Sequence, residues 1–503
     1  MLVVVDNRLR IPAGDLTPEA REALCTEFTY ANPDAQKLKA FGFRRRVPKT
    51  IRTWGESPGW VSFPRGAMPR VRAVLRDAGL NWRVQDARAH VSSTTHGPRA
   101  VPGHLVKLRP FQEKMVRAAV ERENCLWRCP QGGGKTTASI AFASRVGLPA
   151  LFVVSSGELL NQWVRRCRKE LDLEPGVLSG KKKRLADVTV AMQQTLRKRA
   201  ASLRGVFGTV VCDEVQQFAA STFQDVIDQL DCRYRLGVSA DERRSDGKEF
   251  LIHDQFGEVA CEVKHDDLVD DGFILEVEIR VVPTTFRADW YVALDKVKQK
   301  VERYDDLLFA MEQDEARNEV TMWCVGECLA DGEQAIVMSN RRDYCSEVDR
   351  RCVANGIRSG LLIGGEDYRG EFDDTLERMA SGECRVGVGT LQAIGVGVDM
   401  PRIARGVIAT PIANNQKGGP QFKQFRGRFA RTCEGKRDAV LYYIYDPLVF
   451  GSRVVRHLCR WSKRVVVRRD GSWVDGRQYL KETRDEKPKG RDDDPTLEEV
   501  LGR

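Results

Sequence analysis

The feature that most constrains the fold is an alternation of short apolar segments with amphipathic helical segments, which occurs twice along the chain. The first set spans about residues 103 to 280, where segments such as ALFVVSS and GTVVCD alternate with helices such as ELLNQWVRRCRKEL. The second set follows a charged helical connector at about 288 to 330 and includes QAIVMSN and AVLYYIYD. Apolar strands separated by helices predict a parallel sheet covered on both faces. The sequence therefore predicts an α/β fold with two such units in tandem.

The segments outside these two units are basic. Residues 1–102 predict a small mixed α/β module, and residues 1–100 hold 17 Lys and Arg against 9 Asp and Glu, most of the net charge of +10. We expect this module to bind a polyanion, with nucleic acid the commonest. The predicted division is 1–102, 103–285 for the first unit, 286–446 for the connector and second unit, and 447–503 for a basic extension and tail.

Two local signals mark the C-terminal part. The dipeptide Asp470-Gly471 predicts a β-hairpin. From about residue 483 the chain is charged and free of aromatic residues, which is typical of disorder. Within this tail, DPTLEEVLGR is a candidate docking helix for a protein partner, and a plain disordered end is the alternative.

The composition bounds the class of protein. Hydrophobic residues make up 42% and charged residues 30% of the 503 positions, and no apolar run approaches the ~18 residues needed to cross a bilayer. We expect a cytoplasmic protein of a bacterial or phage-infected cell, with no membrane partner. The 14 cysteines and 6 histidines are dispersed without a C-x-x-C pair, so we expect buried thiols and no zinc or iron–sulfur site.

The segment CPQGGGKTT, residues 129–137, predicts a phosphate-binding loop between a strand and a helix. Glycines let backbone amides approach an anion closely, and the usual signature ends in G-K-[ST]. The candidate nucleotide ligands are Gly132, Gly133, Gly134, Lys135, Thr136 and Thr137. Lys135 would reach the β- and γ-phosphates, and Thr136 would bind Mg²⁺. A glycine-rich turn that merely precedes a helix is the alternative.

An acidic pair follows a later apolar strand in TVVCDEVQQF. Asp213 would hold Mg²⁺ and Glu214 would act as the base that activates water. An Asp-Glu pair after a strand means little alone, but together with the phosphate loop it predicts ATP hydrolysis. ATP and Mg²⁺ are therefore the expected ligands.

Four further segments resemble motifs of the superfamily 2 helicases and translocases: LRPFQ (108–112), GVSAD (237–241), GTLQAIGVGVDMP (389–401) and QFRGRFAR (424–431). The resemblance covers about residues 105 to 446 and implies two tandem RecA-like domains. It also implies that Gln112 reads adenine and that Asp399 belongs to the nucleotide site. With GVSADERRSDGKEF, the chain looks like the group of type III restriction helicase subunits and UvsW-like helicases.

The last of these segments also makes physical sense by itself. Gln424, Arg428 and Arg431 share one helical face at spacings of four and three, which suits a site where charge develops on a phosphoryl group. A solvated basic helix is the alternative. Because these residues lie in the second unit, hydrolysis would require the two units to close. Gln216 replaces the family's usual His or Asp, and we expect it to hydrogen-bond Ser239 or Gln424.

Two departures from the family pattern leave the coupling of hydrolysis to movement open. Asp241 stands where motif III usually carries threonine, and Val396 stands where related sequences often carry glutamate.

Nucleic-acid contacts follow from the resemblance for small polar residues at strand ends, which position a backbone without reading bases. They are Ser155, Ser156, Gln193, Thr195, Ser339, Asn340, Arg341 and Thr390. For each, a local cap or turn is an equal alternative. In the N-terminal module, FGFRRRVPKTIRTW mixes aromatic and basic residues, which is typical either of base stacking or of a small core with a basic surface.

These patterns together predict an ATP-dependent DNA helicase or translocase that moves on or remodels DNA in recombination, repair or replication, including branch migration. Single-stranded, forked and branched duplex DNA are the expected partners, and RNA is less favoured. Three alternatives remain: a motor subunit of a restriction or defence complex, an RNA helicase, and a scaffold that binds nucleic acid without hydrolysing ATP.

Overall fold

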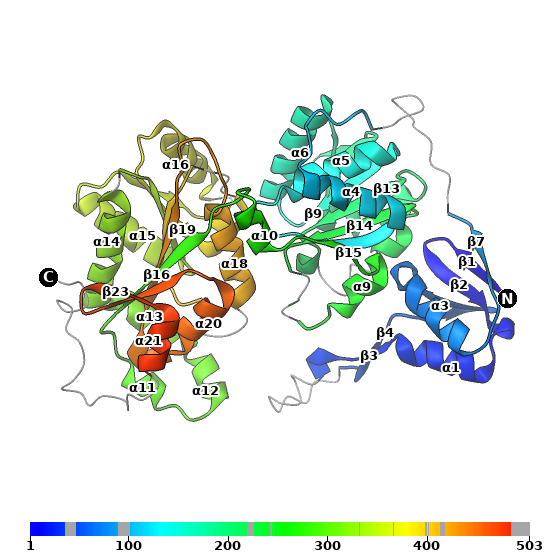
Figure 1. The fold of residues 1–503 in the computed structure, drawn as a ribbon, viewed down its shortest axis with the longest axis horizontal. Coiled ribbons are helices and arrows are strands. Elements are labelled where there is room, and N and C mark those ends of the chain that lie inside the picture. The colour runs from blue at the N-terminus through cyan, green and yellow to red at the C-terminus, as the bar shows by residue number, and fades with distance from the viewer. Residues whose placement is uncertain are drawn as a thin grey trace. The chain divides into compact units, whose positions relative to one another are not determined.

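The computed structural model divides the chain into two compact units, residues 1–265 and 266–503 (Figure 1). The structure describes residues 1–35, 47–88, 101–180, 182–218, 226–241, 244, 246–330, 332–365, 367–397, 400, 402–412 and 418–483. Within these ranges, the side chains at 297, 395–397, 418, 420, 421 and 424 are not described. The predicted tail after residue 483 and the basic run at 41–46 lie outside the described residues.

The first unit begins with a small α/β module. Its five-stranded sheet has the order β5-β6-β2-β1-β7, and α1 and α3 complete its core around Leu9, Leu24 and Phe63. A separate hairpin, β3–β4, extends from it. The elements are β1 (Leu2–Val5), β2 (Arg8–Pro12), α1 (Pro18–Glu27), β3 (Thr29–Ala31), β4 (Thr50–Arg52), β5 (Gly55–Ser57), β6 (Trp60–Pro64), α3 (Met68–Asp77) and β7 (Arg83–Asp86). The described part of the module is thus the mixed α/β fold that the sequence predicts.

The module packs tightly against the rest of the first unit. Gly66 lies so close to α9 (Phe250–Phe256) and its end that an added Cβ would stand 2.3 Å from the backbone nitrogen of Gly257. Arg65 is buried and donates to the side chain of Asn124 at 2.7 and 3.0 Å. On the same side, Arg70 pairs with the fully buried carboxylate of Asp254. The module therefore shares a polar, buried interface with its neighbour.

The first large sheet has eight strands in the order β11-β10-β12-β9-β13-β14-β8-β15, all parallel except β11. Helices α4, α5 and α6 lie on one side of it and α9 on the other (Figure 1). The elements are α4 (Pro110–Arg122), β8 (Asn124–Arg128), α5 (Lys135–Val146), β9 (Ala150–Val154), α6 (Gly157–Leu171), β10 (Gly176–Leu178), β11 (Lys183–Arg184), β12 (Val188–Met192), α7 (Gln193–Leu196), β13 (Thr209–Asp213), β14 (Tyr234–Ser239) and β15 (Val259–Glu262). Parallel strands bring all their carboxyl ends to one edge, where the candidate residues lie.

The second sheet also has eight strands, in the order β18-β19-β17-β20-β21-β16-β22-β23. Helices α14 and α15 pack on one face and α18 on the other (Figure 1). The elements are β16 (Val277–Pro283), α14 (Glu315–Ala330), β17 (Ala335–Ser339), α15 (Arg342–Ala354), β18 (Ser359–Leu362), α16 (Arg369–Ser381), β19 (Val386–Thr390), α17 (Leu391–Gly397), β20 (Arg405–Ile408), α18 (Gly418–Phe429), β21 (Ala439–Tyr445), β22 (Val465–Arg469) and β23 (Ser472–Asp475).

One strand that the sequence assigned to the first unit belongs to the second unit in the structure. The sequence suggested that residues 103–285 belong to the first unit, yet β16 pairs with β21 and β22 of the second sheet. Its Val277, Ile279 and Val281 are fully buried there. A single apolar strand after a helix carries no local sign of which sheet it joins, so tertiary pairing decides.

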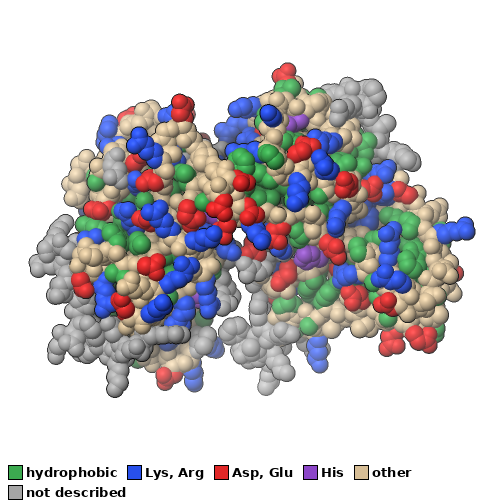
Figure 2. Space-filling view, in the orientation of Figure 1, with side chains coloured by type: hydrophobic (Ala, Val, Ile, Leu, Met, Phe, Trp, Pro, Cys, Tyr) green, Lys and Arg blue, Asp and Glu red, His purple; other side chains and the backbone are tan. Residues whose placement is uncertain are grey.

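The C-terminal extension contributes to this second sheet. Asp470 and Gly471 have φ values of 50° and 75° and join β22 to β23, as the predicted hairpin requires. The extension also contains three short helices, α19 (Pro447–Phe450), α20 (Arg453–Trp461) and α21 (Gly476–Glu482), of which α20 and α21 contact the hairpin. Lys and Arg side chains are frequent on the surface over this part of the unit (Figure 2).

The connector is helical, as expected, with α11 (Asp289–Val292), α12 (Val297–Glu302) and α13 (Tyr304–Gln313). Most cysteines are buried, which agrees with the expected thiols. Among the described residues, no helix combines the length and the apolar character needed to cross a membrane.

Candidate active site

The loop of residues 129–134 joins β8 to α5 at the carboxyl edge of the first sheet. Gly132 and Gly134 have φ values of 84° and 73°, a conformation that glycine adopts without strain. Gly134 is the N-cap of α5 and has no side chain to satisfy the first amides of the helix. These amides are therefore available to an anion at the helix N-terminus.

Gln112 holds this loop from α4. Its Oε1 accepts from the Arg109 amide at 2.9 Å, and its Nε2 donates to the carbonyls of Gly133 and Gly134, each at 3.3 Å. A Cβ on Gly134 would lie 2.3 Å from this Nε2, so the loop and the glutamine fit only when residue 134 is glycine. The amide of Gln112 is thus already engaged by the loop and the first turn of α4.

Lys135 faces the acidic pair. Its Nζ donates to Glu214 Oε1 at 3.1 Å, and both side chains are nearly buried. Burial by itself would lower the pKa of Lys135, but the carboxylates of Glu214 and Asp213 outweigh it, and the pKa is raised. The ammonium group is therefore held in its charged form at the mouth of the loop.

Asp213 ends β13 and is buried beside Glu214. Burial, and then the neighbouring carboxylate, raise the pKa of Asp213 to about 6. Its Oδ2 accepts from the indole Nε1 of Trp163 at 2.9 Å, and its Oδ1 accepts from the Glu214 amide at 3.0 Å. Trp163 is a member of the site that the sequence analysis did not identify, because its indole meets Asp213 only through tertiary packing.

The residues present fit a divalent cation. Asp213 and Thr136 offer a carboxylate and a hydroxyl, the hard oxygen ligands that Mg²⁺ prefers, and the indole and the backbone amide that donate to Asp213 are both neutral. Thr137, the next residue, is already occupied, since its hydroxyl donates to Glu170 at 3.3 Å and accepts from Arg166.

Glu214 is connected to the loop after β14. The Gln216 Nε2 donates to Glu214 Oε2 at 2.7 Å, and Ser239 Oγ donates to Gln216 Oε1 at 2.7 Å. The expected hydrogen bond between Gln216 and Ser239 is thereby confirmed. Asp241, in the place of the usual threonine, donates its amide to Ser239 Oγ at 3.0 Å, so its backbone completes the chain of contacts.

Arg244 secures the turn after the acidic pair. Its guanidinium donates to the carbonyls of Gln216 at 3.1 Å and Phe218 at 2.5 Å. Two further hydrogen bonds of 2.8 Å join it to Asp246. Glu214 itself has a left-handed φ of 48°, which non-glycine residues adopt rarely, so such external support matters here.

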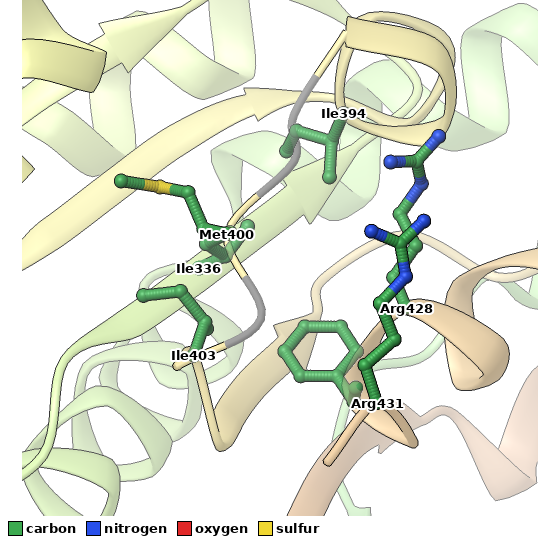
Figure 3. Close-up of a pocket in the computed structure, with 7 residues that line it drawn as sticks. Ile336, Ile394, Met400, Ile403, Arg428 and Arg431 are labelled. Atoms are coloured by element: carbon green, nitrogen blue, oxygen red, sulfur yellow. The ribbon is translucent and has the colours of Figure 1, made fainter. Parts of the chain in front are cut away.

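In the second unit, Arg428 lies in α18 and Arg431 follows its end. Both line a small pocket with Ile336, Ile394, Met400, Ile403 and Phe429. Their side chains extend in the same direction in the close-up (Figure 3). The side chain of Gln424 and the whole of Asp399 lie outside the described residues.

The nucleic-acid candidates of the first unit follow two neighbouring parallel strands, β9 and β12. Ser156 caps α6 by accepting from the Leu159 amide at 3.2 Å, and Ser155 donates to Gln217 Oε1 at 2.8 Å. Gln193 and Thr195 belong to α7, and both are partly exposed. The serine hydroxyls thus have local partners, as the alternative interpretation allows.

The candidates of the second unit show the same pattern. Ser339 accepts from the Arg341 amide at 3.1 Å, and Thr390 accepts from the Ala393 amide at 3.3 Å. The Asn340 amide donates to Thr410 at 2.8 Å. The Arg341 guanidinium pairs with Glu312 of α13 at 2.8 Å, a partner that the sequence did not suggest.

Comparisons with known proteins agree with this arrangement. The family model described as "Type III restriction enzyme, res subunit" matches residues 105–242. The chain is 26% identical over 414 residues to the probable helicase D10 of Escherichia phage T5, covering 81% of this chain and 84% of that protein. The chain is therefore similar to the type III restriction enzyme res subunit over residues 105–242 and to a helicase over most of its length. The likeness to helicases and translocases indicates an enzyme that hydrolyses ATP.

A second relative is the DNA 3'-5' translocase XPB2 of Sulfurisphaera tokodaii, 24% identical over 352 residues, covering 65% of this chain and 79% of the relative. Among solved structures, Saccharomyces cerevisiae Dbp5 bound to RNA and ADP BeF3 matches with a TM-score of 0.52 and 14% identity, covering 79% of this chain and 94% of that one. The likeness shows the fold, two tandem RecA-like domains.

Proposed function

We propose that the protein is an ATP-dependent DNA helicase or translocase that couples ATP hydrolysis to movement on, or remodelling of, DNA. The observation that carries the proposal is the continuous path from Lys135 through Glu214 and Gln216 to Ser239. It connects the candidate catalytic base to the loop after β14, so a change at the nucleotide can be transmitted to that loop. The name of the phage T5 protein supports helicase activity, and the name of XPB2, a DNA 3'-5' translocase, supports DNA as the substrate.

In this proposal, each residue of the first unit has one task. The amides of residues 132–134 and Lys135 would bind the phosphates. Gln112 would keep the loop in shape, and would contact adenine through the second lone pair of its Oε1, since the structure already engages the amide with the loop and α4. Thr136 and Asp213 would hold Mg²⁺, which would neutralise charge on the phosphates. Glu214 would orient and deprotonate the attacking water, and its ammonium partner Lys135 would turn to the γ-phosphate when ATP binds.

The second unit would complete the reaction. We propose that Gln424, Arg428 and Arg431 contact the γ-phosphate when the units close, as charge develops on the transferred group. We also propose that Asp399 belongs to the nucleotide site. Closure and reopening would then convert hydrolysis into movement along a strand contacted by Ser155, Ser156, Gln193, Thr195, Ser339, Asn340, Arg341 and Thr390.

The wider assignments are also proposals. The N-terminal module, residues 1–102, would add affinity for single-stranded, forked or branched DNA, and the segment DPTLEEVLGR of the C-terminal tail would recruit a protein partner. A cytoplasmic location, in recombination, repair or replication, would suit such an enzyme.

The experiment is steady-state ATPase without nucleic acid and with single-stranded, duplex or forked DNA, or RNA. The wild type is compared with Lys135→Ala and Glu214→Gln. Stimulation by DNA that both variants abolish supports the proposal. Stimulation by RNA alone favours an RNA helicase, and negligible rates with normal DNA binding favour a scaffold. Rates that appear only with an added nuclease or methyltransferase subunit favour a motor subunit of a restriction complex.

A further inference from the structure

The helix α20 presents three arginines on one exposed face. Arg453, Arg456 and Arg460 are spaced three and four residues apart, so they share one side of the helix. Val454, Val455 and Leu458 on the other side are buried. We call these three arginines the α20 stripe.

The stripe lacks the acidic partners that its neighbours have. Lys463 pairs with Asp266 at 2.8 Å, and Arg464 pairs with Glu278 at 2.6 Å. Within the part of the chain that the structure describes, no carboxylate lies within ion-pair distance of the stripe, and Arg456 meets only a serine hydroxyl at 3.4 Å. Three neighbouring like charges repel one another, and a polyanion would relieve that repulsion.

The spacing of the stripe suits a nucleic-acid backbone. Seven residues of α-helix rise about 10 Å, and one strand of a B-form duplex carries a phosphate about every 3.4 Å of its axis. The stripe therefore spans about three phosphates. Arginine also matches phosphate oxygens with paired N–H donors.

The stripe is anchored to the helix that carries Arg428. The aromatic ring of Trp461, at the end of α20, lies 5.7 Å from that of Phe422 in α18. Arg426 of α18 donates to the Trp461 carbonyl at 2.5 Å. A Cβ on Gly419, also in α18, would lie 2.9 Å from the indole, so the two helices are in close contact.

We propose that the α20 stripe is a further DNA-binding site, which holds the phosphates of one strand and bears on α18 through Trp461. This inference rests on the proposed function, since it assigns an additional contact to the same substrate. DNA bound there would favour one position of α18 and thereby influence where Arg428 and Arg431 lie.

The test measures DNA affinity of the full chain against salt concentration by fluorescence anisotropy. Arg453→Gln/Arg456→Gln/Arg460→Gln should make the slope of log K against log salt shallower by about 2 to 3, because each lost phosphate contact accounts for about 0.9. The charge-conserving triple lysine variant should retain most of the slope. A matched control, Lys296→Gln/Lys298→Gln/Lys300→Gln, removes three charges at α12 and should leave it unchanged.

The outcomes separate the two proposals. Failure of the wild type to bind DNA at all would overturn the proposed function. Two results would overturn the α20 site alone, provided that the wild type binds DNA normally. One is an unchanged slope in the triple Arg→Gln variant of α20, and the other is an equal change of slope in the triple Lys→Gln control at α12. Binding to poly-glutamate is measured with the same variants. If the triple Arg→Gln variant loses this binding while its slope with DNA is unchanged, the α20 site is also overturned, because the stripe then recognises an acidic protein.

Discussion

The interface between the N-terminal module and the first large sheet depends on one buried carboxylate. Asp254 in α9 is fully buried, and its Oδ1 accepts from Arg70 of α3 and from the Tyr30 hydroxyl, the latter at 3.0 Å. The change Arg70→Met keeps the unbranched apolar stem of the side chain and removes the charged guanidinium. Asp254 would then stay buried and, of these two partners, would keep only the Tyr30 hydroxyl.

The size of the effect follows from burial. Removing one partner of a buried ion pair costs about 3–5 kcal/mol. Arg70 is 33% exposed, and solvent therefore screens part of the interaction. We expect Arg70→Met to lower the free energy of unfolding of the first unit by about 2–3 kcal/mol, which is at or below the lower limit of that range because of the screening.

Urea unfolding followed by circular dichroism measures this loss. Arg76→Met is the matched control, because Arg76 lies on the same helix and is exposed, and we expect it to cost less than about 0.5 kcal/mol. Asp254→Asn in the Arg70→Met background should recover part of the loss. If Arg70→Met and Arg76→Met unfold at the same urea concentration, the ion pair does not secure the module.

Three further predictions concern single sites. Gly134→Ala should weaken ATP binding, because φ is 73° and the new Cβ would lie 2.3 Å from a side-chain nitrogen; Gly180→Ala, with no atom within 4 Å, is the control in a nucleotide-binding assay. Gln216→Ala should lower kcat for ATP about ten- to a hundredfold, since one of its two hydrogen bonds is to a carboxylate; a kcat within twofold of the wild type would contradict this. Arg317→Met should destabilise the second unit by about 3–5 kcal/mol in urea unfolding, because it leaves Asp446 buried without its cation, and an unchanged midpoint would argue against it.

The parts of the fold that local pattern determines could be predicted. Strands such as Ala150–Val154 and Ala335–Ser339 are apolar except for the terminal Ser339, and both are central strands of parallel sheets. The hairpin at Asp470-Gly471 follows from two residues that tolerate a positive φ. The fold class is confirmed for the same reason, since the alternation of apolar strands with amphipathic helices is a local pattern of the sequence.

The contacts that complete the site could not be predicted. Trp163 meets Asp213 across 50 positions of sequence, and Gln112 meets the glycine loop across about twenty. Such partners depend on how helices pack on the sheet, and an amphipathic pattern does not show which apolar residue also donates a hydrogen bond. Likewise, Ser156 reads equally well as a helix cap and as a strand-end contact.

The position of β16 inside the second sheet has a practical consequence for fragments of this protein. β16 is paired on both sides, by β21 and by β22, and β22 belongs to the segment after residue 446. A fragment that ends at 446 would leave the seven-residue β16 as an open edge with unpaired amides and carbonyls. We expect such a fragment to self-associate through strand pairing, whereas one that continues through α21 keeps the edge covered.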